Sequence, residues 1–371
     1  ERDALQAEAL AMSGVNFSQI ILTVQEPLQK YLTKFAETGV QMPTYTVWDI
    51  MIIDSDLLKD VTSGSYVPDL NFSDDKKKEN VDKDEKKKQE AEKPKDVPLF
   101  GPYQAPEGGY GGFRGRFSTI VEDEERKISI RKWPKISSLP KRKMIAEQIN
   151  HILSKQEYQS LFDGSMGNEQ ITPAQIVGRI YDYISEMDQS IDVTAPKESF
   201  GRDGVGDKRS LYQTGKPKSA PMDSIAELRL IPGMTDGIYQ VLSRAISIYG
   251  ESDTINILSA SDEVLASVFY MCAKNRETSL FSRPGFEDEL MSEWNRRKGE
   301  GLVQLSFEGM SKYLEEKGVE VDKEECSKLM GTESKTFTVK STATVGSVTK
   351  TLLMRIRSAG GITTLYQFQY L

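Results

Sequence analysis

The chain has 371 residues, 38% of them hydrophobic and 28% charged, which is enough for about two domains with real cores. Its net charge of -8 argues against a polyanion as a partner for the whole surface. One histidine and two cysteines are too few for a zinc site or histidine-based catalysis, and no apolar run approaches the roughly 20 residues that span a bilayer.

The first 37 residues predict a long helix. Apolar residues recur at helical spacing, and Pro27 is expected to kink or interrupt the run. The chain begins within this pattern without an initiator methionine or a signal peptide, and we expect the helix to continue upstream. Several apolar residues exceed what one sheet contact requires. They are therefore the candidate partner-binding residues: Leu5, Leu10, Met12, Phe17 and Ile21.

Strand and loop patterns follow this helix. Residues 44–56 are rich in Thr, Val and Ile and predict a strand. Residues 73–96 hold nine lysines against nine acidic residues and almost no apolar side chains, so we expect a partly disordered loop that extends to residue 112. Alternating residues at 117–121 and 128–130, on either side of an acidic turn, predict a β-hairpin.

A helical block and a final group of strands complete the pattern. Helical periodicity dominates from about residue 140 to 330, and a capping box begins at Thr172. Cys272 is expected to pack as a small buried side chain, and pairing with Cys326 in an oxidising compartment is left open. The last forty residues predict three strands. Strands before and after one helical block indicate a single sheet interrupted by an inserted helical domain.

Residues 224–242 form a helix–turn–helix pattern around Pro232 and Gly233 that could seat a nucleic-acid phosphate. The turn lacks the second glycine of helix-hairpin-helix motifs, and Asp236 places negative charge where the phosphate would approach. Two arginines against three acidic residues give 219–245 a net charge of -1. The pattern therefore favours a purely architectural hairpin, with Leu228, Leu230 and their apolar neighbours in the core.

The chain resembles the large minor pseudopilins, the K class, of bacterial type II secretion systems. Residues 223–233 match the family's Asp-Ser, Glu-Leu-Arg and Gly pattern, and 255–260 match the following Ile-Asn-Ile segment. The acidic turn between the strands of the expected hairpin also resembles the family, whereas the family's Asn-Thr-Ala reads Leu-Ser-Ala here.

The resemblance implies an α+β fold: a pilin-like N-terminal stalk helix on an antiparallel β-sheet, with a large all-α domain inserted between strands. We expect the stalk and the first part of the sheet at 1–134, the inserted domain at 135–330 and the completing strands at 331–371.

The resemblance also implies a function. The protein would be non-enzymatic, held in the inner membrane by an N-terminal apolar helix with its soluble domain in the periplasm. It would cap the pseudopilus tip and assemble with two smaller minor pseudopilins, with no nucleic acid or small-molecule substrate.

Calcium is the one cofactor that the resemblance suggests. Residues 182–207 are rich in acidic side chains and interrupted by Gly and Pro, and oxygen-rich loops suit a hard cation, although the EF-hand spacing is absent. Members of the family bind calcium in the helical domain. Some of the family's acidic residues are lost or shifted here, and three remain as candidate ligands: Asp182, Asp188 and Asp207.

Three alternatives remain at this stage. The chain could be a minor tip component of a type IV pilus, which shares the fold family but has other partners. It could be a helix-hairpin-helix nucleic-acid-binding protein, against which the charge argues. A two-carboxylate hydrolase is a third, although no acidic pair has a spacing that supports it.

Overall fold

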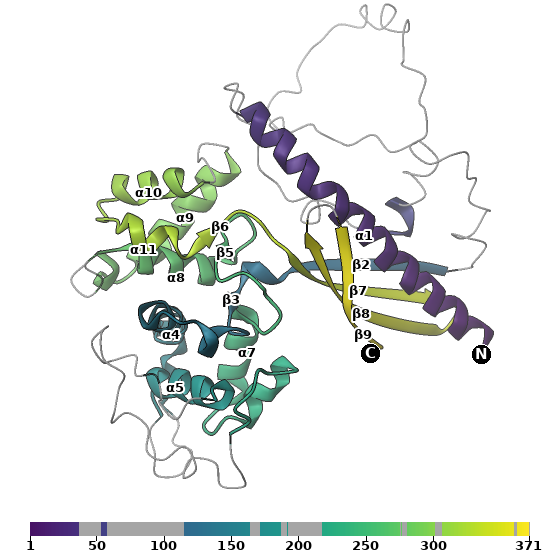
Figure 1. Cartoon of the computed structure of the whole chain (residues 1–371), viewed down its shortest axis with the longest axis horizontal. Coiled ribbons are helices and arrows are strands. Elements are labelled where there is room, and N and C mark those ends of the chain that lie inside the picture. Colours follow the sequence, from purple (N-terminus) through teal and green to yellow (C-terminus); the bar gives the residue numbers. More distant parts are fainter. Residues whose placement is uncertain are drawn as a thin grey trace, which may run out of the picture.

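A computed structural model gives the arrangement of most of the chain (Figure 1). The residues that the structure describes are 1–36, 53–57, 115–163, 171–186, 191, 217–274, 276, 280–300, 306–359 and 362–370. The expected loop at 73–96 and most of the strand expected at 44–56 lie outside these residues.

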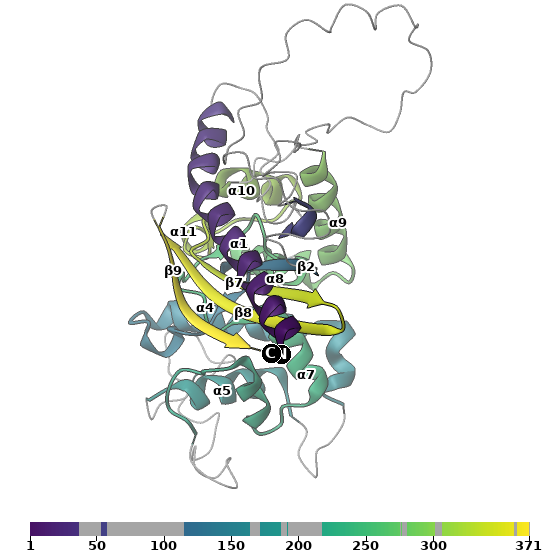
Figure 2. The same ribbon diagram turned by 90° about the vertical axis from the view of Figure 1, so that its right-hand side faces the viewer.

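A long N-terminal helix and an antiparallel sheet form one half of the molecule. Helix α1 (Arg2–Ala36) continues through Pro27 and crosses one face of a sheet whose strand order is β1-β2-β7-β8-β9. Figure 2 shows α1 lying across strands β7 and β8 of this sheet. The strands are β1 (Ile53–Asp54), β2 (Gly115–Asp123), β7 (Thr336–Val345), β8 (Val348–Ala359) and β9 (Ile362–Tyr370).

Every neighbouring pair in this sheet is antiparallel. The three C-terminal strands confirm the sequence prediction, since Thr, Val and aromatic residues suit a pleated, half-buried surface. Strands β7 and β8 are joined by a tight turn at Gly346, which has a φ of 58°. The α+β fold class is therefore confirmed.

A mainly helical domain is inserted between β2 and β7 (Figure 1). Its described helices are α4 (Leu139–Leu153), α5 (Pro173–Ile184), α7 (Asp236–Ala245), α8 (Asp262–Cys272), α9 (Phe286–Gly299), α10 (Phe307–Glu316) and α11 (Lys323–Ser327). Four short strands form two parallel pairs, β3 (Ile128–Ser129) with β4 (Ile246–Ser247) and β5 (Ile255–Asn256) with β6 (Met330–Gly331). The sequence had predicted a purely helical insertion, and these two strand pairs show that it also contains short strands.

The hairpin expected at 117–130 does not form. Strand β2 instead pairs with β1 and β7 in the main sheet, and β3 pairs in parallel with β4 of the inserted domain. The chain turns between them through a 3-10 segment, η1 (Glu124–Arg126), whose acidic side chains are buried. Alternation alone predicts two strands, but it does not determine their partners.

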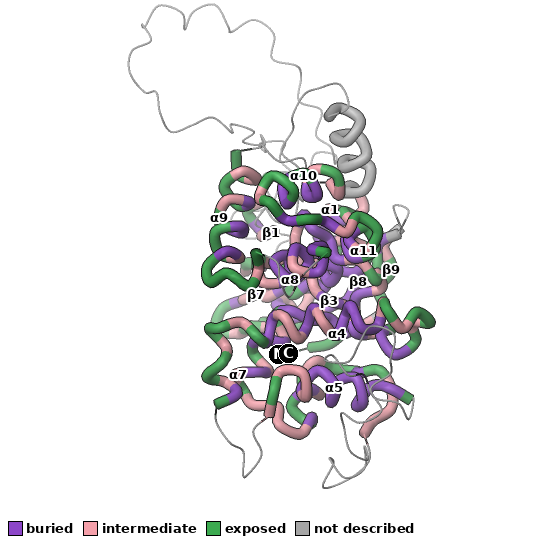
Figure 3. The backbone as a smooth tube through the Cα atoms, turned by 90° about the vertical axis from the view of Figure 1, so that its left-hand side faces the viewer, coloured by how far each residue is buried: buried purple, intermediate pink, exposed green. Residues whose placement is uncertain are grey.

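Each half has its own apolar core. One core lies between α1 and the sheet, and a larger one fills the helical domain. Buried positions are nearly continuous along α4 and α5, whereas they alternate with exposed positions along α9 and α10 (Figure 3). Among the described residues, no helix is both long and apolar enough to cross a membrane.

Candidate functional site

Helix α1 packs tightly against the sheet at Gly14. A Cβ atom there would lie 2.7 Å from the Phe117 ring, and closer still to the hydroxyl groups of Thr119 and Ser341. Those two hydroxyls are hydrogen-bonded to each other, with Thr119 Oγ1 donating to Ser341 Oγ at 3.0 Å. Glycine therefore allows the helix backbone to reach the sheet surface, which fixes the position of α1 along the strands.

The five candidate partner-binding residues of α1 separate into two groups. Leu10 and Phe17 are buried against the sheet and belong to this chain's own core. Met12 and Ile21 are half-buried at the edge of that core, and Leu5 is 68% exposed. Helical spacing predicted one apolar stripe, but the width of the sheet determines which residues it covers. Leu10 and Phe17 therefore offer no exposed surface to a partner.

Three consecutive acidic residues are buried where the sheet meets the helical domain. Asp123 ends β2 and is 2% exposed, and its Oδ2 accepts hydrogen bonds from Asn256, Ser259 and Ser334 at 3.1, 2.5 and 2.5 Å. Its Oδ1 accepts one from the backbone of Glu125. Burial raises the pKa of Asp123 to about 6, although the bonds from the two serines lower it.

The next two carboxylates bind other segments of the same junction. Glu124 accepts hydrogen bonds from Ser247, at 2.5 Å, and from Thr338 on β7. Glu125 accepts backbone N–H groups from Glu251, Lys335 and Thr336. Together the three side chains join the end of β2 to the start of β7 and to the segment at 247–259.

Two arginines of β8 reach the same junction from the sheet. Arg355 is stacked over the ring of Tyr249 at 3.6 Å from its centroid, and Arg357 lies 3.6 Å from the Glu251 carboxylate. Sheet and inserted domain are thus linked by buried hydrogen bonds and by a more exposed ion pair. The sequence interpretation placed this acidic run in the turn of a hairpin and assigned it no contact with the rest of the chain. The clue that it missed is that the acids directly follow a strand.

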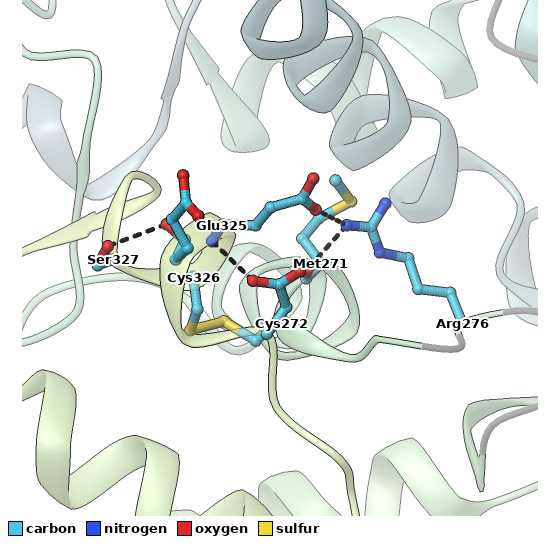
Figure 4. The surroundings of a disulfide bond; sticks show 8 residues. Met271, Cys272, Arg276, Glu325, Cys326 and Ser327 are labelled. Carbon is cyan, nitrogen blue, oxygen red and sulfur yellow. Dashed lines mark hydrogen bonds and ion pairs between the residues drawn. A yellow bond between two sulfur atoms is a disulfide. The ribbon is translucent and has the colours of Figure 1, made fainter. Parts of the chain in front are cut away.

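A disulfide joins Cys272 at the end of α8 to Cys326 in α11, across 54 residues of sequence (Figure 4). Both cysteines are fully buried. Beside it, Arg276 donates to the Glu325 carboxylate at 2.7 Å and to the Met271 carbonyl at 2.9 Å. The structure thus settles the pairing that the sequence left open.

The single histidine of the sequence bridges three helices of the inserted domain. His151 on α4 is stacked on Tyr270 of α8 at 3.9 Å and is 2.8 Å from the Glu287 carboxylate of α9. Lys155 lies 2.5 Å from the same carboxylate. Burial raises the pKa of Glu287, but the hydrogen bond and charge of His151, with the charge of Lys155, outweigh it and lower that pKa to about 2.

Only one of the three candidate calcium ligands lies within the described residues. Asp182 is on α5 and is 1% exposed, whereas Asp188 and Asp207 fall outside. Within the described residues no group of three or more His, Cys, Asp or Glu side chains is arranged to hold a metal ion. Calcium binding therefore stays a prediction.

The segment at 224–242 is a structural turn. Its first part is a 3-10 helix, η4 (Ile225–Leu230), with the capping box of Ser224 and Glu227 in place, and Thr235 caps α7. Gly233 has a φ of 84°, and Arg179 donates to the carbonyl of Pro232 at 2.9 Å. Leu228 is buried, but Leu230 is 64% exposed and not in the core as expected, because the 3-10 repeat turns it outward.

Comparison with solved structures gives a structural likeness. No family model and no curated protein matches the sequence. A chain in the crystal structure of the GspK-GspI-GspJ complex from the enterotoxigenic Escherichia coli Type 2 Secretion System is 16% identical, with a TM-score of 0.42. The match covers 70% of this chain and 80% of that chain. A likeness of this size does not assign the protein to a family.

Proposed function

We propose that the protein is a non-enzymatic large minor pseudopilin, of the K class, that caps the tip of the periplasmic pseudopilus in a type II secretion system. The observation that carries the proposal is the order of its parts. A long helix lies along one face of an antiparallel sheet, and a mainly helical domain interrupts that sheet between β2 and β7. The resemblance at 223–233 and 255–260 falls within this inserted domain.

The two halves suit different tasks under this proposal. The helix and sheet would join the fibre, with one side of α1 packed on the sheet and the side that carries Leu5 exposed to a partner. The inserted domain is fixed to the sheet by the buried carboxylates of Asp123, Glu124 and Glu125. It would therefore cap the fibre as a rigid body and block further growth above it.

The proposed location is the periplasm, with an inner-membrane anchor upstream of the described helix. The buried disulfide between Cys272 and Cys326 supports an oxidising compartment, since such bonds are rare in the cytosol. Calcium bound near Asp182 is part of the same proposal. If it binds, millimolar calcium should raise the melting temperature more than sodium of equal ionic strength, and Asp182→Asn should reduce that rise.

Co-purification with the two smaller minor pseudopilins of the same source tests the proposal. The parent should bring down both, whereas Leu5→Glu combined with Met12→Glu should abolish recovery, because charged side chains replace apolar ones on the exposed side of α1. Circular dichroism should show that the helical domain keeps its fold.

Leu230→Glu is the matched control, because it also replaces an exposed leucine but lies in the helical domain. It should leave recovery unchanged. A parent that binds neither small pseudopilin would contradict the proposal. Binding to type IV pilus components instead would assign the protein to that system.

A further inference from the structure

Within the part of the chain that the structure describes, β9 is an edge strand without the usual protection by charge or proline. It pairs with β8 on one side and ends the order of the described strands on the other. Its nine residues, Ile362–Tyr370, include no charged residue and no proline. Exposed edge strands in proteins that stay monomeric are normally protected by charge, proline or a covering element. An edge of this length without charge or proline is therefore suited to contact with another chain.

The exposed side chains of β9 show which face is covered. Leu365, Phe368 and Tyr370 are 46%, 39% and 48% exposed. Their cross-strand partners on β8 are Ile356, Met354 and Leu352. Directly opposed residues of an antiparallel pair point to the same face.

Those three β8 partners are buried in the core beneath α1. The apolar layer on the α1 side of the sheet therefore continues one strand beyond the part that α1 covers. Phe368 and Tyr370 are in edge-to-face contact at 4.8 Å, as residues on one face of a strand would be.

Helix α1 forms the other wall of this surface. Glu1, Leu5, Glu8 and Met12 follow one another at spacings of four, three and four residues and so share one stripe of the helix. The hydroxyl of Tyr370 donates to the Glu8 carboxylate, which places that stripe on the β9 side. We call the surface formed by Leu5, Met12, Leu365, Phe368 and Tyr370 the β9 ledge.

We propose that the β9 ledge is the docking surface for an amphipathic helix of a second, different protein, which lies alongside α1 and over β9. This proposal rests on the proposed function, which supplies the partner. A helix fits because packed helices lie 8–10 Å apart, about the width of two strands. An added strand would pair with the β9 backbone but would leave Phe368 and Tyr370 exposed on the sheet face.

Charge identifies the kind of helix. The β9 ledge and the α1 stripe contain two charged residues, Glu1 and Glu8, and both are acidic. The whole chain also carries a negative net charge, -8. A second copy of α1 would bring the same acids together, and like charges oppose such a pairing. The partner helix should therefore carry an apolar stripe beside lysine or arginine, and it belongs to a different chain.

The test uses the parent chain and the soluble domains of the two smaller minor pseudopilins from the same source as probes. Phe368→Lys and Leu365→Lys should each weaken binding at least about tenfold, because each adds charge inside the ledge and repels a basic partner. Ile120→Lys is the matched control. Ile120 is 67% exposed, but it is on β2, one residue from core-facing Thr119 and Val121, and so points to the opposite face of the same sheet.

Photocrosslinking identifies the occupant. A photoreactive phenylalanine analogue at position 368 should crosslink to a helical peptide of one small pseudopilin, and the analogue at position 120 should not. If the lysine variants bind as tightly as the parent, the β9 ledge is not the docking surface. A crosslink to a strand peptide would likewise reject a helix as the occupant. Either result would leave the proposed function standing. A parent that binds neither small pseudopilin would overturn both proposals.

Discussion

The two halves of the molecule differ in how completely they bury their apolar side chains. Of the eight large apolar side chains that are exposed in the described part of the chain, six lie on α1 and the sheet and two in the inserted domain. The inserted domain also has the larger core and the disulfide. The inserted domain thus buries nearly all of its described large apolar side chains within itself. The half formed by α1 and the sheet leaves more of them exposed, and such a surface is suited to contact with further chains.

Removing the disulfide is the strongest test of how far the inserted domain is stabilised by its own contacts. Cys272→Ala with Cys326→Ala should lower the stability of the helical domain by about 4 kcal/mol, because a 54-residue separation gives the unfolded chain much more freedom. Thermal melting followed by near-ultraviolet circular dichroism should report the loss. A reducing agent should lower the melting temperature of the parent but not of the double variant. Equal responses would show that the bond does not stabilise the domain.

Gly14→Val tests how α1 holds the other half together. The new side chain would overlap Thr119, Ser341 and Phe117, and we expect a loss of about 3 kcal/mol in the docking of α1. Limited proteolysis should then cleave α1 while the helical domain stays intact. Gly299→Val serves as the control, because nothing lies within 4 Å of a Cβ at that position. Equal protease sensitivity of the two variants would contradict this role of Gly14.

The two regions should respond to pH in opposite directions. The pKa of Asp123 at the junction is raised from 3.8 to about 6, so the folded state binds its proton more tightly than the unfolded state. Its stabilising effect is full below about pH 4 and is lost, by up to about 3 kcal/mol, as pH rises through 6. Glu287 has a lowered pKa of about 2, so its contribution is present above pH 4.5 and is lost as pH falls toward 2.

Unfolding by urea at pH values from 3 to 7 measures both effects. Asp123→Asn should remove the loss of stability between pH 4 and 6, and Glu287→Gln should remove the loss at acid pH. The difference between each variant and the parent isolates the one group. If either variant keeps the parent's pH profile, that carboxyl does not titrate as its surroundings indicate.

Gly233→Ala should have the smallest effect. The backbone φ of 84° disfavours any side chain, and a Cβ there would overlap the Ile171 side chain. We expect a loss of about 1 to 2 kcal/mol, confined to the helical domain. Gly285→Ala has a similar positive φ of 77° but no atom within 4 Å. The difference in melting temperature between the two variants therefore measures the steric part alone.

Local patterns predicted most of the elements. The capping box at Thr172 and the three C-terminal strands formed as expected, because neighbouring residues determine caps and alternation. Helix α9 lies inside the region predicted as helical but was not singled out, because its sequence, FEDELMSEWNRRKG, has few apolar residues, although Leu290 and Trp294 are buried. The spacing of four residues between Leu290 and Trp294 was the signal from which this helix could have been predicted.

Pairing and burial were not predictable in the same way. The expected hairpin failed because β3 found a partner more than one hundred residues away. Alternation specifies a strand's faces but not its neighbour. Leu5 and Leu10 are chemically alike, yet one is exposed and the other fully buried, because only the sheet determines which side of α1 it covers.

The sequence by itself determined the order of helix, strands, helical block and strands, because these depend on periodicity and turn residues within short windows. Tertiary structure decided the rest. It buried three consecutive carboxylates at Asp123, Glu124 and Glu125, since donors from distant segments meet there and offset their desolvation. It also left the apolar residues of β9 beside α1 uncovered, because one helix is narrower than the sheet on which it lies.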